Sequence, residues 1–75
     1  MSVMSILSHE GDTKIIWDPD NADEVASARR TFNELVGDKK FAAYRVDDTG
    51  DRSEVIREFD ETAEKMILRP PMAGG

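Results

Sequence analysis

The sequence predicts an α+β domain in which one helix packs across a mixed sheet of four or five strands. A single segment carries helix signals at both of its ends, and short runs of β-branched and aromatic residues lie before and after it. The chain has 75 residues, which leaves apolar surface for only one core. We therefore expect one domain over residues 1–70, followed by a short tail.

The N-terminal part of the chain predicts two strands joined by a turn. The segments 2–8 and 13–17 alternate between two faces, and the second is rich in β-branched residues. Gly11 lies between them and can adopt a positive φ without a Cβ clash. In the second strand, Trp17 is expected to face the helix as the largest core side chain, while Ile16 points to the other face.

The helix is predicted over residues 22–36. Asn21 can cap its first turn, and Glu24 follows three residues later in a capping-box relation. Gly37 comes directly after the last apolar residue, where a left-handed C-cap is expected. The apolar stripe that faces the sheet consists of Val25, Ala28, Phe32, Leu35 and Val36.

The C-terminal half predicts three further strands, over residues 41–46, 54–59 and 65–69. An Asp- and Gly-rich loop separates the first two, and a turn separates the last two. The near-continuous apolar character of the last strand favours a central position in the sheet. Pro70 and Pro71 end it, because neither residue can donate a backbone hydrogen bond to a strand ladder.

The order of these elements and the end of the chain resemble the ubiquitin-like β-grasp proteins. Residues 66–69 running to Gly74 and Gly75 are similar to the last strand and diglycine tail of ubiquitin. The end Pro-Pro-Met-Ala-Gly-Gly resembles the Pro-Pro-x-Ala-Gly-Gly end of the molybdopterin-synthase small subunit and related sulfur carriers. The Asp- and Arg-rich stretch between helix and last strand departs from ubiquitin. Prokaryotic ubiquitin-like proteins are the nearest subgroup, and the resemblance implies parallel terminal strands at the centre of the sheet.

The resemblance also implies a function for the tail, residues 71–75, which is expected to be flexible. In this family a partner activating enzyme uses ATP to adenylate the C-terminal carboxylate, which then becomes a thioester or a thiocarboxylate. Gly75 would carry that carboxylate, and Gly74 would let the chain pass close to enclosing walls because it has no Cβ. The extended spacer consists of Pro70, Pro71, Met72 and Ala73. Protein conjugation and sulfur delivery both need such a tail with a carboxylate that can be adenylated. The choice between protein targets and a sulfur acceptor therefore stays open.

Composition excludes several other functions. Sixteen acidic and ten basic residues give a net charge of −6, which argues against nucleic-acid binding. The chain has no cysteine, which favours a reducing cytoplasm, and no apolar run long enough to span a membrane. We expect a monomer that is not an enzyme, has no catalytic residue and binds no cofactor itself. The alternative is a protein-interaction module without covalent chemistry, which would use an apolar sheet face formed by Phe41, Ala43 or Ile16.

Three acidic clusters could suggest metal sites, and each has a simpler interpretation. His9 beside Glu10 and Asp12 is interpreted as an exposed turn, because transition-metal sites usually need more than one imidazole or thiolate. Residues 18–21 resemble the start of a calcium loop but lack its later ligands, so helix capping explains them better. The acids within residues 47–51 are interpreted as a solvated turn. The sequence therefore predicts no metal site.

Overall fold

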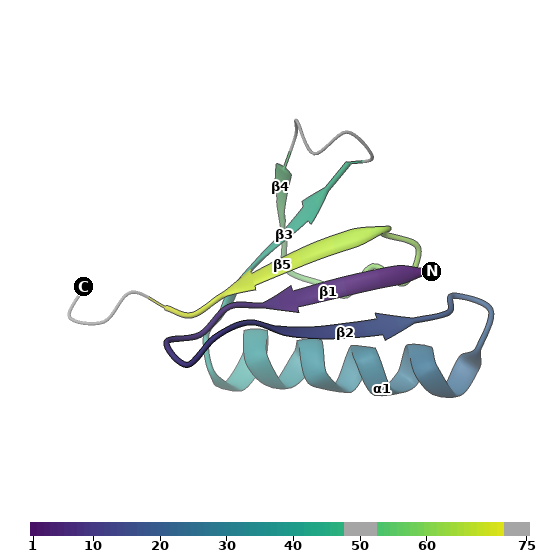
Figure 1. Ribbon diagram of the computed structural model, residues 1–75, viewed down its shortest axis with the longest axis horizontal. Helices are drawn as coiled ribbons and strands as arrows, with labels where there is room; N and C mark the ends of the chain where they lie inside the picture. Colours follow the sequence, from purple (N-terminus) through teal and green to yellow (C-terminus); the bar gives the residue numbers. More distant parts are fainter. Residues whose placement is uncertain (48–52, 72–75) are drawn as a thin grey trace.

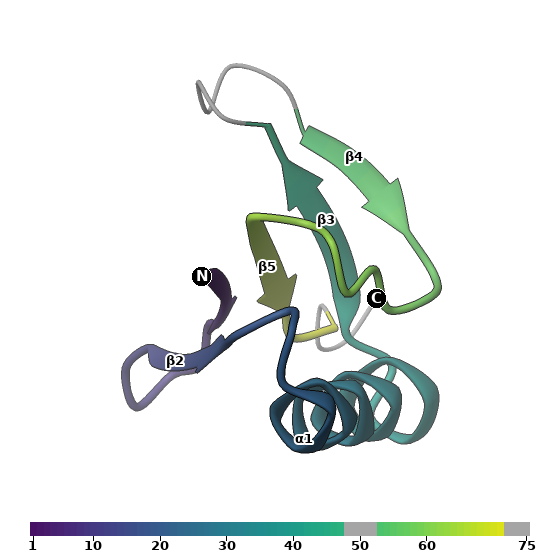
Figure 2. The same ribbon diagram turned by 90° about the vertical axis from the view of Figure 1, so that its right-hand side faces the viewer.

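Five strands form one mixed sheet, and a single helix packs across one of its faces (Figures 1 and 2). The computed structural model describes residues 1–47 and 53–71. Within these residues no helix is long and apolar enough to cross a membrane. The predicted α+β class is confirmed. In chain order the elements are β1 (Ser2–Ile6), β2 (Thr13–Trp17), α1 (Ala22–Asn33), the π-helical turn η1 (Glu34–Asp38), β3 (Ala42–Val46), β4 (Ser53–Ile56) and β5 (Lys65–Arg69).

The last strand lies in the middle of the sheet, whose order is β2-β1-β5-β3-β4. It pairs parallel with β1 on one side and antiparallel with β3 on the other. The remaining neighbours, β1 with β2 and β3 with β4, are antiparallel. Both the central position of this strand and the parallel pairing of the two terminal strands are confirmed. Since β5 has partners on both sides, its backbone is held firmly where the tail begins.

Aromatic side chains connect the sheet, the helix and the segment before β5. Trp17 and Phe32 are fully buried, as predicted, and Phe59 lies between them. The ring centroids of Trp17 and Phe59 are 5.2 Å apart, and those of Phe32 and Phe59 are 5.7 Å apart in an edge-to-face arrangement. The Trp17 indole N–H donates to the Glu61 carbonyl at 3.2 Å. The other fully buried large side chains are Met4, Met66 and Leu68.

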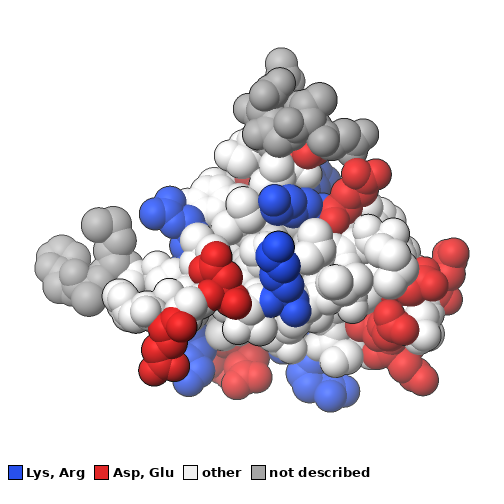
Figure 3. Space-filling view, viewed as in Figure 1, with Lys and Arg blue, Asp and Glu red and all other residues white. Residues whose placement is uncertain are grey.

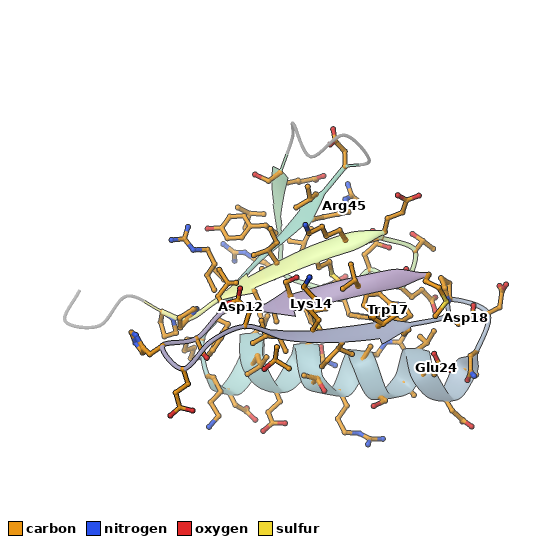
Figure 4. The ribbon with its side chains drawn as sticks, in the orientation of Figure 1. Asp12, Lys14, Trp17, Asp18, Glu24 and Arg45 are labelled. Atoms are coloured by element: carbon orange, nitrogen blue, oxygen red, sulfur yellow. The ribbon has the colours of Figure 1, made fainter. Side chains whose placement is uncertain are left out.

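The start of α1 follows the sequence prediction closely. The Asn21 side-chain oxygen accepts from the backbone N–H groups of Asp23 at 3.1 Å and Glu24 at 3.2 Å. Glu24 does not complete the usual capping box, because the Asn21 N–H is bound to the Asp18 carbonyl at 2.9 Å. Instead, its carboxylate accepts from the Asp18 N–H at 3.0 Å. Figure 4 shows Asp18 and Glu24 side by side at this end of the helix.

The end of the helix differs from the prediction, because Gly37 is not a left-handed C-cap. The last turn widens into η1, in which the Lys39 N–H donates to the Glu34 carbonyl at 3.2 Å, five residues back. The extra residue in this turn moves the left-handed position to Lys40, whose φ is +63°. The Phe41 N–H then donates to the Leu35 carbonyl at 2.9 Å. Gly37 therefore stays inside the helical segment.

Two predictions about the sheet are also corrected. The strand expected over residues 54–59 ends at Ile56, because the chain bends at the next two residues and Phe59 turns into the aromatic cluster. Ala43 was expected on the outer face, but it is 1% exposed and lies in the core. Phe41 also packs against the core, so of the three residues expected to form an outer apolar patch only Ile16 is exposed. The remaining strands match their predicted ranges to within two residues.

Candidate functional site

The chain leaves the sheet at the end of its central strand. Arg69 is the last residue of β5 and lies opposite Ala42 in the register with β3. Pro70 is partly buried and Pro71 is exposed, so the proline pair ends the strand as predicted. This exit lies at the opposite end of the molecule from the N-terminus (Figure 1). The other predicted tail residues, Met72, Ala73, Gly74 and Gly75, lie outside the described residues.

The face of the sheet that points away from α1 is cationic, although the chain as a whole is acidic. Strand alternation and the register place Lys14, Lys65 and Arg69 on this outward face, together with apolar and hydroxyl-bearing side chains. No strand residue on this face is acidic. Figure 4 labels Lys14 on β2 with Asp12 beside it. Figure 3 shows cationic side chains over the middle of the visible surface, one acidic group next to them and the other acidic groups toward the margins. The outward face therefore has a local charge opposite to that of the chain.

Apolar side chains lie among these cations. Ile16 is 60% exposed and Val55 is 63% exposed, at the two edges of the sheet. Between the edges, Ile67 and Tyr44 are register partners, and with Arg69 and Ser53 they line a depression of about 230 Å³. A surface that combines cations with exposed aliphatic groups suits a partner with carboxylates around an apolar contact. Sequence reasoning missed this arrangement because the residues come from different strands.

A second charged group, centred on Arg45, stabilises the fold. The Arg45 guanidinium donates to the Asp60 carboxylate at 2.8 Å and also pairs with Glu54. The other Asp60 oxygen accepts from the Thr62 hydroxyl at 2.7 Å and the Thr62 N–H at 3.0 Å. These hydrogen bonds hold the pKa of Asp60 below its ordinary value. The hydrogen bond from the Thr62 hydroxyl lowers the pKa most, and the one from Arg45 comes next. Since every partner is internal, this group anchors the turn before β5 to β3.

The acidic turn between β1 and β2 is exposed, as expected. His9, Glu10 and Asp12 are exposed around the β1–β2 turn, where Gly11 has a φ of +127° as predicted. The turn is closed by the Ser8 hydroxyl, which donates to the Gly11 carbonyl at 2.6 Å. Among residues 1–47 and 53–71, no three or more His, Cys, Asp or Glu side chains are grouped so as to hold a metal ion. Asp48 and Asp51 lie outside the described residues.

Comparisons with protein-family models, with curated proteins and with solved structures found no match. What the chain does must therefore be inferred from its own fold and residues. One helix on a five-stranded mixed sheet with parallel terminal strands is compatible with a β-grasp. The candidate site combines the tail exit at Arg69 with the cationic outward face beside it.

Proposed function

We propose that this chain is a small ubiquitin-like protein modifier or sulfur carrier of the β-grasp type. The observation that carries the proposal is the central strand β5, which ends at Arg69 and is followed directly by two prolines and the sequence Met-Ala-Gly-Gly. A strand held on both sides provides a rigid base from which a tail can extend. Pro70 and Pro71 favour an extended backbone, which lowers the entropy lost when a tail enters a narrow site.

In the proposed reaction, an activating enzyme supplies ATP and the catalytic groups, and this chain supplies one carboxylate. A Gly75 carboxylate oxygen attacks the α-phosphate of ATP, and pyrophosphate leaves, so that an acyl adenylate forms. The sulfur of a thiol or of hydrosulfide then attacks the acyl carbon and AMP leaves, which gives a thioester or a thiocarboxylate, respectively. Gly74 and Gly75 have no Cβ and fit a channel close to the nucleotide. The chain itself needs neither a catalytic residue nor a bound cofactor.

The proposal is tested by intact mass spectrometry of the full chain after incubation with ATP and its candidate activating enzyme. A thiocarboxylate adds the mass difference between sulfur and oxygen, and a conjugate appears as a larger species that contains this sequence. Deleting Gly74 and Gly75 should abolish either product but leave thermal unfolding unchanged, because the described core ends at Leu68. No product with an enzyme that activates other carriers would reject the proposal.

The second candidate is an interaction module without covalent chemistry, and the outward face favours it specifically. Lys14, Lys65 and Arg69 lie there without acidic neighbours on the strands, and Ile16 is exposed beside them. Such a module would keep its partner after deletion of Gly74 and Gly75. It would lose the partner when Lys14 and Arg69 are changed to Glu, whereas covalent activation needs the tail. The two variants therefore separate the two functions.

A further inference from the structure

A groove of about 510 Å³ lies where η1, the start of β3 and the end of β4 meet. Six of its eight lining residues are apolar. Val36, Phe41 and Ile56 are partly buried and also pack against the core, whereas Val55 is 63% exposed. The volume falls within the range of about 300–1,000 Å³ that is typical of ligand pockets. This groove therefore offers a larger recess for side chains than the depression of about 230 Å³ on the cationic outward face.

The two charged residues that line the groove are both cationic. Lys40 comes from the helix end and Arg57 from the segment after β4, and no acidic residue among those described lines the groove. Neither cation forms an ion pair with a described residue. Two other cavities nearby are each lined by three acidic residues: Asp47, Glu54 and Asp60 in one, and Glu58, Asp60 and Glu61 in the other. In a chain with a net charge of −6, the groove is thus a local exception.

The backbone around the groove is also unusual. The π-helical turn η1 and the left-handed Lys40 form its helix side, and a lysine is a costly residue at a φ of +63°. On the sheet side, β4 is the last strand in the order, so one edge of its backbone has no strand partner within the described sheet. An extended segment lying against β4 could add main-chain hydrogen bonds to contacts within the groove.

We propose that this groove binds a short extended segment of a partner protein in which aliphatic side chains are flanked by Asp or Glu. The apolar lining receives the aliphatic groups, and the carboxylates pair with Lys40 and Arg57. The proposal goes beyond the function proposed above, because it needs neither the tail nor an activating enzyme. It also assigns a partner to a surface on the opposite edge of the sheet from β2.

The test is an NMR titration of the ¹⁵N-labelled full chain with three capped hexapeptides. The first is Asp-Glu-Ile-Leu-Glu-Asp, the second replaces the acids by lysine, and the third replaces Ile-Leu by Ser-Ser. Only the first peptide should shift the amide signals of residues 40–43 and 55–57. The double variant K40E/R57E should weaken its binding at least about tenfold, since both charge-assisted contacts become repulsive. The matched control is K39E, because Lys39 is exposed and adjacent in sequence but does not line the groove.

Three results would overturn the proposal: no shift at the groove with millimolar peptide, equal binding of the lysine peptide, or unchanged binding by K40E/R57E. Shifts confined to Lys14 and Arg69 would also overturn it, because they would place the acidic segment on the outward face. Thermal unfolding of each variant checks that the charge changes leave the fold intact. Deletion of Gly74 and Gly75 should leave peptide binding unchanged, so failure of the tail chemistry and failure of the groove are told apart.

Discussion

Replacing Gly37 by alanine should stabilise this protein, whereas the same replacement at Gly11 should destabilise it. Both positions are sterically open, because a Cβ added at either glycine would meet no atom within 4 Å. They differ in backbone conformation. Gly11 has a φ of +127°, while Gly37 lies in η1 and its φ is outside the positive region. The pair therefore isolates the backbone term, since side-chain contacts are equivalent.

The expected magnitudes follow from that difference. Alanine inside a helical segment is favoured over glycine by about 0.5–1 kcal/mol, mainly because glycine loses more backbone entropy on folding. An L-residue held in a left-handed conformation costs about 1–2 kcal/mol. The total stability of a domain of this size is about 4–11 kcal/mol, from about 0.05–0.15 kcal/mol per residue. Changes of this size are therefore a measurable fraction of the whole, and each kcal/mol should shift Tm by about 4–8 °C.

The assay is urea unfolding followed by far-UV circular dichroism, with the free energy of unfolding compared at equal m-values. G37A should move the midpoint to higher urea, and G11A should move it to lower urea. A destabilised G37A would mean that Gly37 needs the left-handed conformation after all, which would refute the assignment of that role to Lys40. K40G supplies an independent check, because relief of the positive φ at this lysine should not destabilise the protein.

Three further perturbations test the core, the helix cap and the Asp60 hydrogen bonds. Phe32→Ala should cost about 3–5 kcal/mol because the side chain is fully buried, and a loss below about 1 kcal/mol in urea unfolding would contradict the packing of α1. Asn21→Ala should cost about 1 kcal/mol, while Asn21→Ser should restore most of it by keeping an oxygen acceptor. The lowered pKa of Asp60 means that its carboxylate contributes stability above the ordinary Asp pKa of about 3.9, and this contribution is lost as the pH falls through the folded-state value. Asp60→Asn should therefore flatten the fall in stability below about pH 4, and an unchanged acid profile would argue against the hydrogen bonds from Thr62 and Arg45.

The parts of the fold that could be predicted are those decided by neighbouring residues. The start of α1 follows from Asn21, whose side chain reaches the N–H groups of the next turn. The central position of β5 is indicated by its run of apolar residues, although only Met66 and Leu68 are fully buried and Ile67 lies on the outward face. The end of the helix could not be predicted in this way. Whether Gly37 or Lys40 takes the left-handed position depends on whether the last turn is an α or a π turn.

Long-range contacts explain the other differences between the sequence prediction and the structure. Val55, Arg57 and Phe59 alternate as a strand would, yet Phe59 leaves that pattern to pack between Trp17 and Phe32. The cationic outward face also depends on contacts between distant parts of the chain, because its three cations come from two strands far apart in the sequence. Alternation indicates which way each side chain points, but only the strand order and register bring them onto one surface.

The parallel pairing of β1 with β5 has a mechanical consequence. The N-terminus and the tail exit lie at opposite ends of this pair, so a force that pulls the two chain ends apart draws the strands past each other (Figure 1). Under such shear the hydrogen bonds between residues 3–6 and 65–68 carry the load together, rather than opening one after another as at a peeled sheet edge. A pull on the two chain ends therefore loads the central strand pair in the direction in which its hydrogen bonds resist together, whereas the edge strands β2 and β4 lie outside the loaded pair.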